Sequence, residues 1–425
     1  MNEPLLSVDE ALERMLSGIE PLPLESVGVD EAVGRVLAAP LRARLTLPPW
    51  DNSAMDGFAV RSADVEAATV DRPVRLRVVG EVAAGHAPTA VVTAGAALRI
   101  LTGAMLPAGA DAVVPVEETD APAGVADLPA SVGILAPAAS GQHVRLAGSD
   151  FGAGADLLAG RLRINPQALA LIVAGGHGSV PVFRRPRVAV LATGDELVGP
   201  GEALGPGQIH DSNSPGLAAQ ARALGADVRR LGVARDTPAE VEAALRSALE
   251  WADVIVCSGG VSVGAHDVVR EAFGRLGSVD LWRVAVQPGK PLAFGRATAP
   301  DRHLVLLFGL PGNPVSSFVT FEIFVAPVLR ALAGDRDPTS RRIVKARLAE
   351  AVRKAPGRRT FLRVTLASDP ERPGELLARL AGGQGSHVLS ALAAADGLAV
   401  VAENVEALPA GAAVEVWRLP STEGA

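Results

Sequence analysis

The sequence predicts a multidomain α/β protein whose largest part is a doubly wound, mostly parallel sheet. Two observations support this fold class. From Pro186 to about 334, buried apolar runs such as RVAVLATG and DVIVCSGG alternate with helix-like segments, as in β-α-β units. Over 49–144 and from about Arg341 onward, short β-rich runs alternate with Gly and Pro turns. We therefore expect an inserted β domain and a C-terminal β domain beside the sheet.

The first part of the chain carries helix signals. Ser7 and Glu10 have the spacing of a capping box, and apolar residues recur on one face after them, which predicts a first helix. A second short helix is expected over 29–38, and a third begins at about Pro166. The stretch before residue 49 is expected to be extended and to lead into the first β-rich part.

Five strands and four helices are expected in the α/β part. The strands are RVAVLATG, DVRRLGVARD, DVIVCSGG, LWRVAVQPG and HLVLLFGLPGNP in chain order. The helices are expected over 215–224, after Thr237, over HDVVREAFGRL and over the long segment PVSSFVTFEIFVAPVLRALAG. Thr237, Pro238 and Glu240 supply an N-cap, a first-turn proline and a capping-box partner for the second of these helices.

Composition excludes several classes of protein. Lys and Arg number 40 against 47 Asp and Glu, so the net charge is -7 and no basic field for nucleic acid is present. The single cysteine, Cys257, can form neither an intramolecular disulfide nor a cysteine zinc site. The N-terminus shows no signal-peptide pattern, and the apolar stretches are short or broken. We therefore expect a cytoplasmic protein without membrane contact.

Residues suited to chemistry follow the predicted strands of the α/β part. The segments TGDEL, ARD, SGGVSVGAHD, QPGKP and LPGNPVSS each come after one strand, and ligands of open α/β sheets bind at the carboxyl ends of strands. The glycine-rich turn and the helix start at Asn313 can both direct backbone N–H groups at a phosphate. Lys290, held between two prolines, suits an oxyanion. Structural turns, helix caps and a solvated lysine are the alternatives.

Three of these segments contribute carboxylates. Glu196, Asp236 and Asp267 come from separate loops that are expected to converge near the glycine-rich turn. Oxygen ligands beside a phosphate site suit a hard cation, most simply Mg²⁺ bridging a phosphoanhydride. Each residue taken alone also fits a helix cap or a surface charge.

The stretch PPWDNSAMDGFAV, residues 48–60, is rich in oxygen ligands and contains no Lys or Arg. Its Asp-Gly pair predicts a tight turn that exposes the carboxylate of Asp56. We expect Trp50 and Phe58 to anchor the loop. A purely structural turn is the alternative.

Eight strings in order give the chain a family resemblance. They are DNSAMDGFAV, RILTGAMLPAGADAVVPVE, LATGDELV, GQIHDSNS, SGGVSVGAHD, QPGKPLAFG, GLPGNPVSS and GQGSHVLSAL. With these strings the whole chain resembles the MoeA family of molybdopterin molybdenumtransferases and the E domain of gephyrin. One departure is Gln287, because many relatives carry Lys there.

The resemblance implies four domains and a homodimer. The expected domains are an elongated N-terminal domain (1–48 with 145–180), an inserted β domain (49–144), a MogA-like molybdopterin-binding domain (181–334) and a C-terminal β domain (335–425). The active site would lie between the molybdopterin-binding domain of one subunit and the second domain of the other. Asp56 would reach across the dimer to meet the anion pocket of the partner.

The resemblance also implies roles for individual residues. Catalytic roles are expected for Asp56, Thr102, Glu196, Asp236 and Asp267, of which the last three are also the expected metal ligands. Substrate-binding roles are expected for Asp150, Gly194, Ser258, Gly259, Gly260, Ser262, Gly264, Gly312 and Asn313. Molybdate-binding roles are expected for Lys290, Pro291, Ser316, Arg363 and Ser386. Arg358 and Arg359 lie close to Arg363 in the sequence and compete with it for that role.

The implied reaction is molybdenum insertion into adenylylated molybdopterin with release of AMP, the final step of molybdenum cofactor biosynthesis. It would use Mg²⁺, with molybdate and adenylylated molybdopterin as substrates, and would allow transient contact with the MogA-type adenylyltransferase. Two alternatives stay open at this point. The chain could be the adenylyltransferase of the same pathway, which would consume ATP, or a non-catalytic scaffold like gephyrin. A sugar-phosphate or nucleotide enzyme is a more distant alternative.

Overall fold

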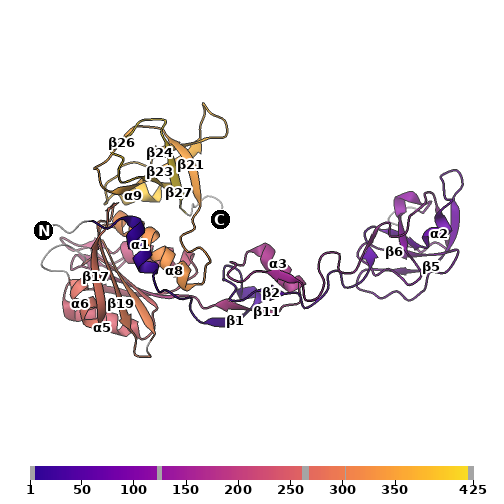
Figure 1. Ribbon diagram of the computed structural model, residues 1–425, viewed down its shortest axis with the longest axis horizontal. Coiled ribbons are helices and arrows are strands. Elements are labelled where there is room, and N and C mark those ends of the chain that lie inside the picture. The colour runs from indigo at the N-terminus through magenta and orange to yellow at the C-terminus, as the bar shows by residue number, and fades with distance from the viewer. Residues whose placement is uncertain (1–4, 122–126, 261–267, 302, 420–425) are drawn as a thin grey trace.

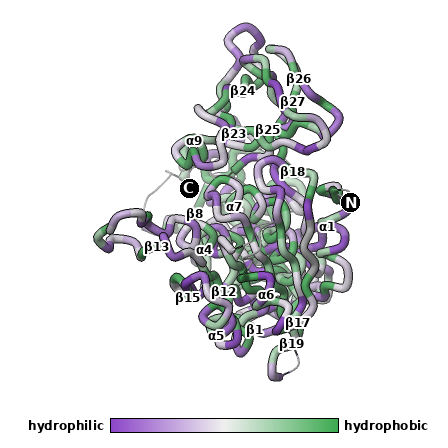
Figure 2. Tube along the Cα trace, turned by 90° about the vertical axis from the view of Figure 1, so that its left-hand side faces the viewer, coloured by the Kyte–Doolittle hydropathy of each residue, from purple (hydrophilic) through white to green (hydrophobic). Residues whose placement is uncertain are grey.

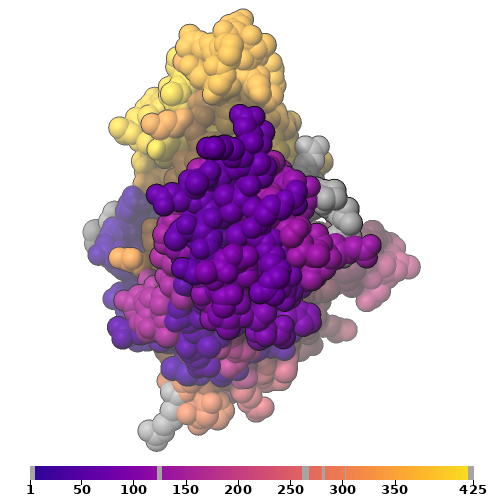
Figure 3. Space-filling view, turned by 90° about the vertical axis from the view of Figure 1, so that its right-hand side faces the viewer, coloured from indigo at the N-terminus to yellow at the C-terminus, as the bar shows by residue number. Residues whose placement is uncertain are grey.

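A computed structural model describes residues 5–121, 127–260, 268–301 and 303–419. The chain is elongated, with a large α/β body and a β barrel at one end, a narrow middle part, and a separate β body at the far end (Figure 1). Figure 3 views the molecule from the end of the far body, with the barrel rising behind it. Sequence-distant segments build the middle part, so the chain leaves it and returns to it.

The α/β body contains a six-stranded sheet. Its strands run in the order β15 (Asp227–Ala234), β12 (Arg187–Thr193), β16 (Val254–Ser258), β20 (Leu304–Leu310), β19 (Pro291–Thr298) and β17 (Gly277–Arg283). The first four strands are parallel, whereas β19 is antiparallel to both of its neighbours. The mostly parallel, doubly wound sheet confirms the predicted fold class.

Helices cover both faces of this sheet because its strands are apolar on both sides. Alternate residues of β16 enter two different cores: Val254 and Val256 pack on one face, and Ile255 and Cys257 on the other. The first face is covered by α1 (Val8–Leu16), α4 (Asn213–Ala223), α7 (Pro314–Thr320) and α8 (Ala326–Leu332), with a π-helical stretch (Phe321–Val325) joining the last two. The second face is covered by α5 (Pro238–Leu249) and α6 (Val268–Leu276).

Two of the predicted helix starts, at Ser7 and at Thr237, are confirmed by side-chain caps. Ser7 Oγ accepts a hydrogen bond from the Glu10 amide at 3.1 Å, and Thr237 Oγ1 accepts one from the Glu240 amide at 3.4 Å. Among the described residues one helical stretch, Pro314–Leu332, has the length and hydropathy of a membrane span. The chain buries 78% of that apolar window within itself, which is typical of a core helix.

The C-terminal part forms a closed barrel. Strands β21 (Ile343–Leu348), β27 (Ala413–Arg418), β25 (Gly397–Val401), β23 (Arg359–Ser368) and β24 (Leu376–Leu380) pair in a ring that returns to β21. The short pair β22 (Val352–Arg353) and β26 (Ala407–Leu408) and helix α9 (Leu389–Ala393) lie outside the ring. Strand β18 (Val286–Gln287) of the α/β body pairs with β23, and Phe361 enters the α/β core. The barrel is therefore joined directly to the sheet domain.

The far body is a five-stranded sheet in the order β7 (Ala112–Pro115), β4 (Gly57–Val60), β6 (Ala96–Ile100), β5 (Val74–Val82) and β8 (Ser131–Ile134). It also carries α2 (Ser62–Val65), a 3-10 turn (Val116–Glu118) and the pair β3 (Asn52–Ser53) and β9 (Val144–Arg145). The middle part pairs β1 (Leu24–Gly28) with β11 (Ser179–Phe183) and β2 (Leu41–Arg42) with β10 (Asp156–Leu158), under α3 (Pro166–Ala174).

Three details differ from the sequence expectations. The predicted helix over 29–38 is wrong: a single 3-10 turn (Val29–Glu31) forms, and Gly34 at φ 79° is followed by isolated bridges from Val36 to Arg163 and from Leu37 to Val182. Strand β19 is not among the five strands that the sequence predicts. Helix α1 packs in the α/β core, whereas the resemblance places residues 1–48 in the N-terminal domain. The domain boundaries stay a prediction.

Candidate functional site

The carboxyl ends of the strands gather at one edge of the sheet. Thr193 at the end of β12 is paired with Ala234 of β15, and Ser258 at the end of β16 is paired with Leu310 of β20. Two antiparallel steps, from β20 to β19 and from β19 to β17, bring the end of β17 to the same edge. All five predicted loops therefore begin at this edge. A two-stranded arm, β13 (Leu197–Val198) and β14 (Ile209–His210), projects beside it (Figure 2).

The glycine turn after β16 packs against the neighbouring loops. Gly259 and Gly260 have φ values of 91° and 64°, and a Cβ on Gly259 would lie 2.4 Å from the Thr193 carbonyl oxygen. The Asn213 amide nitrogen donates to Ser258 Oγ at 2.8 Å and to the Gly312 carbonyl at 2.6 Å. The predicted positions Gly194, Ser258, Gly259, Gly260, Gly312 and Asn313 thus lie in adjoining loops. Ser262, Gly264 and Asp267 lie outside the described residues.

A group of carboxylates lies beside that turn. Burial and the neighbouring charges of Asp195 and Glu196 raise the pKa of Asp236. The Asp236 amide also donates to Asp195 Oδ1 at 3.2 Å. Sequence reasoning selected Glu196 and Asp236 but missed Asp195, although it adjoins Glu196 in TGDEL.

Carboxylates that repel one another fit a hard cation. In the part of the chain that the structure describes, no group of three or more His, Cys, Asp or Glu side chains forms a complete metal site. Oxygen atoms of a bound phosphate would have to supply further ligands.

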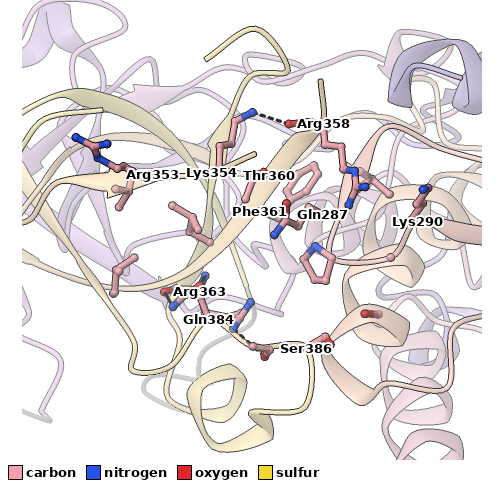
Figure 4. Close-up of a pocket in the computed structure, with 18 of the residues that line it drawn as sticks. Gln287, Lys290, Arg353, Lys354, Arg358, Thr360, Phe361, Arg363, Gln384 and Ser386 are labelled. Carbon is pink, nitrogen blue, oxygen red and sulfur yellow. Dashed lines mark hydrogen bonds between the residues drawn. The ribbon is translucent and has the colours of Figure 1, made fainter. Parts of the chain in front are cut away.

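A second feature is a cavity of about 450 Å³ between the α/β body and the barrel. Four predicted molybdate residues line it: Lys290, Ser316, Arg363 and Ser386, with Pro291 next to Lys290 in the chain. Figure 4 shows Gln287 and Lys290 of the α/β body facing side chains of the barrel. The Val315 amide donates to the Ser386 carbonyl at 3.2 Å, which ties the start of α7 to the barrel loop.

Arg363 is the most unusual residue of this cavity. Its side chain is 1% exposed, and its Nη2 donates to the carbonyls of Gly383 and Gly385 at 2.9 and 3.1 Å. Its Nε has no hydrogen-bond partner, and no described carboxylate forms an ion pair with it. Burial lowers the pKa of Arg363. A buried guanidinium without a counter-charge carries a desolvation cost that its two carbonyl partners offset only in part.

The cavity lining is wholly cationic among its charged residues. Lys290, Arg353, Lys354, Arg358 and Arg363 line it, and no Asp or Glu is among the described lining residues. Partial desolvation and the charges of Arg283 and Arg358 lower the pKa of Lys290. Sequence reasoning missed Arg353 and Lys354, because their positions on β22 and its following loop carry no motif.

The two arginines beside Arg363 in the sequence take different places. Arg358 lines the cavity, whereas Arg359 forms ion pairs with Asp9 of α1 and Glu403 of the barrel. Arg359 therefore fastens the barrel to the N-terminal helix. Of the arginines at positions 358, 359 and 363, only Arg363 both lines the cavity and is buried.

Asp56 lies in the far body, just before β4, and its exposed carboxylate is held by Thr102. The Thr102 amide and hydroxyl donate to Asp56 Oδ1 at 2.6 and 2.7 Å, and these bonds lower the pKa of Asp56. Phe58 anchors the loop with 1% exposure, but Trp50 is 42% exposed, so the expected anchoring by Trp50 is wrong. Within one chain, Asp56 and Thr102 are at the opposite end of the molecule from the sheet edge (Figure 1).

Asp150 belongs to the connection between the far body and the middle part. The side chain of Asp150 is exposed, and its backbone amide donates a hydrogen bond to the Leu47 carbonyl at 3.1 Å. A single chain therefore does not bring Asp150 to the sheet edge either. The roles of all these residues stay predictions.

Comparisons with known proteins agree with the architecture. The chain matches three family models: "MoeA N-terminal region (domain I and II)" over 6–176, "Probable molybdopterin binding domain" over 189–331 and "MoeA C-terminal region (domain IV)" over 345–419. It is 40% identical over 400 residues to "Molybdopterin molybdenumtransferase 2" of Mycobacterium tuberculosis, covering 93% of this chain and 95% of that protein. The "Molybdopterin molybdenumtransferase" of Synechococcus elongatus is 38% identical over 430 residues, covering 98% and 100%.

A solved structure extends the likeness to three dimensions. The crystal structure of a molybdopterin biosynthesis MoeA protein from Pyrococcus horikosii superposes with a TM-score of 0.80 at 34% identity, covering 97% of this chain and 99% of that one. Sequence and structure are therefore similar over nearly the whole length. The chain belongs to the MoeA family of molybdopterin molybdenumtransferases.

Proposed function

We propose that this chain transfers molybdenum into adenylylated molybdopterin and releases AMP, the final step of molybdenum cofactor biosynthesis. The observation that carries the proposal is the cavity in which Arg363 is buried without a counter-ion, together with four further cationic side chains. Tetrahedral oxyanions satisfy such a lining through charge-assisted hydrogen bonds. The relatives named above are molybdopterin molybdenumtransferases, which makes molybdate the proposed occupant.

The proposed roles divide between two ends of the site. Lys290, Ser316, Arg363 and Ser386 would hold molybdate, with Pro291 shaping the loop. The glycine turn at Gly259 and Gly260 and the loop at Gly312 would cradle the phosphates of the adenylylated pterin, because their backbone N–H groups lie at the sheet edge. The roles of Ser262 and Gly264, which lie outside the described residues, are proposed on the resemblance alone.

Mg²⁺ is the proposed metal of the phosphate end. Glu196 and Asp236, with Asp267 as an expected third ligand, would hold it, and Asp195 adds negative charge beside them. Bound there, Mg²⁺ would neutralise charge on the phosphoanhydride. The chain's own contribution is to fix the phosphates at the glycine turn and the oxyanion at Arg363, which orients the two substrates toward each other.

A homodimer is proposed because Asp56, Thr102 and Asp150 lie far from the sheet edge of their own chain. In a dimer, the far body of one subunit would bring the ionised Asp56 carboxylate to the partner's sheet edge. We further propose the four-domain division stated above, a cytoplasmic location and transient contact with the MogA-type adenylyltransferase that supplies the adenylylated pterin.

The reaction can be tested directly. Purified protein supplied with adenylylated molybdopterin, Mg²⁺ and molybdate should release AMP and yield active molybdenum cofactor. Omitting molybdate should prevent cofactor formation, and omitting Mg²⁺ should slow it strongly. If the protein instead consumes ATP, the adenylyltransferase alternative holds. If it yields neither AMP nor active cofactor, the proposed function is wrong.

A further inference from the structure

Arg358 is a cationic residue of the cavity lining whose side chain has no protein partner. It directly precedes β23, is half-buried and lines the cavity. Its guanidinium forms no ion pair and no hydrogen bond with the residues that the structure describes. Water can satisfy an arginine at a surface, so the neighbours of Arg358 decide what it is suited to bind.

The backbone at Arg358 is held in place from both sides. The Arg358 carbonyl accepts a hydrogen bond from Lys354 Nζ at 2.8 Å. The next amide, that of Arg359, donates to the Ala285 carbonyl of the α/β body at 2.8 Å, and the Arg359 side chain is paired with Asp9. The base of the Arg358 side chain is therefore fixed where the barrel meets the α/β body.

The side chain of Arg358 points to the loop that carries Lys290. Gln287 is paired with Thr360, two residues after Arg358, so the start of β23 lies beside the QPGKP loop. Figure 4 shows the Arg358 guanidinium extending from the barrel toward Gln287 and Lys290. Partial desolvation is the main cause of the lowered Lys290 pKa, and the charges of Arg283 and Arg358 add to it, which agrees with this placement.

Two cations therefore lie near each other without a counter-charge. The lining that the structure describes contains no Asp or Glu, and Gln287 beside the two cations is neutral. Like charges repel, and an anion bound between Lys290 and Arg358 relieves that repulsion. A guanidinium also offers parallel donors that match two oxygens of an oxyanion. Arg353 of the same lining lies on the other side of the view from Lys290 (Figure 4).

We propose that Arg358 is a further oxyanion-binding residue, whose guanidinium donates hydrogen bonds to the anion that Lys290 binds. This inference rests on the proposed function, because it takes the cavity as the molybdate site. Arg363 is buried, whereas Arg358 is half-buried and reaches the anion from the accessible side of the cavity. The contribution of Arg358 should therefore weaken as the salt concentration rises.

The test compares Arg358→Met and Arg358→Lys with the wild-type full chain by calorimetric titration of sodium molybdate at low and at high salt. Loss of a charge-assisted hydrogen bond predicts a dissociation constant raised roughly ten-fold in Arg358→Met at low salt, and by less at high salt. Arg358→Lys keeps the charge but loses the planar pair of donors. Its dissociation constant should lie between those of wild type and Arg358→Met.

Thermal unfolding separates an effect on binding from an effect on folding. Because the Arg358 side chain has no partner among the described residues, both variants should unfold at the wild-type temperature without molybdate. The increase in unfolding temperature that molybdate causes should be smaller in Arg358→Met.

Arg379→Met is the matched control. Arg379 is an exposed arginine of β24 that is absent from the cavity lining and forms no ion pair with a described residue. This variant removes the same charge from the barrel and should leave molybdate affinity unchanged.

Three results would overturn the inference, and they are distinguishable. If wild type binds molybdate and Arg358→Met binds it equally well, Arg358 does not contact the anion, whereas the proposed function stands. If Arg379→Met weakens binding as much as Arg358→Met does, the effect is one of net charge and Arg358 has no contact role. If wild type itself binds no molybdate, the proposed oxyanion site is wrong and the role of Arg358 is wrong with it.

Discussion

Replacing Arg363 by Met tests the oxyanion cavity most sharply, because the two residues are similar in length and Met carries no charge. In the absence of an anion, the change removes two hydrogen bonds to glycine carbonyls, worth together about 1–3 kcal/mol. It also removes an unpaired buried cation whose desolvation costs several kcal/mol. These terms oppose each other, so we expect the free energy of unfolding to change by less than about 2 kcal/mol.

Anion binding should respond much more strongly than stability. Removing one partner of a buried, hydrogen-bonded charge pair costs about 2–5 kcal/mol, which is equivalent to roughly thirty-fold or more in affinity. Calorimetric titration with sodium molybdate measures this loss, and urea unfolding measures stability on the same samples.

Arg35→Met is the matched control for that experiment. Arg35 is 6% exposed, but it is paired with Glu25 and donates to the Phe183 carbonyl at 2.8 Å in the middle part. This variant should lose stability and keep its molybdate affinity. The reasoning is refuted if Arg363→Met binds molybdate within two-fold of wild type while remaining folded.

Three further predictions concern the rim, the acidic group and the far body. Gln287→Lys should tighten molybdate binding several-fold at low salt and less at high salt, as titrations at two ionic strengths will show. The pKa of Asp236 is raised in the folded protein, so the free energy of unfolding should fall as the pH rises from 3.8 through the folded-state pKa. The Asp236→Asn variant should abolish this fall in unfolding curves measured at several pH values. It should also reduce the stabilisation that Mg²⁺ gives. Thr102→Val removes a bond that lowers the Asp56 pKa, so the acidic limb of the activity profile should move to higher pH.

Local signals explain which parts of the fold were predictable. Capping at Ser7 and Thr237 and the continuous apolar runs are properties of short segments, and the helices and parallel strands that they predicted are present. The predicted helix over 29–38 does not form because Val36 and Leu37 make β-bridges to Arg163 and Val182, which are contacts that local spacing does not encode. Strand β19 was missed because it follows a proline loop closely and because Gly295 and Arg296 interrupt its apolar run, PLAFGRAT.

The candidate site was predictable only where residues form motifs. Glycine and acidic loops at strand ends could be placed by topology, and Lys290 by its prolines. Arg353 and Lys354 come from barrel segments whose approach to the QPGKP loop depends on the β18–β23 pairing. That pairing joins residues more than 70 positions apart in the chain, so no local pattern could reveal it.

The central claim is that the cationic cavity of one subunit and Asp56 of the other act on the same substrates. Mixing two inactive proteins, Asp56→Asn and Arg363→Met, under conditions that exchange subunits tests it most directly. In a mixed dimer, one site would combine an intact cavity with an intact Asp56, so random exchange should restore about one quarter of wild-type cofactor formation. Complete absence of recovery, with subunit exchange verified, would contradict the account.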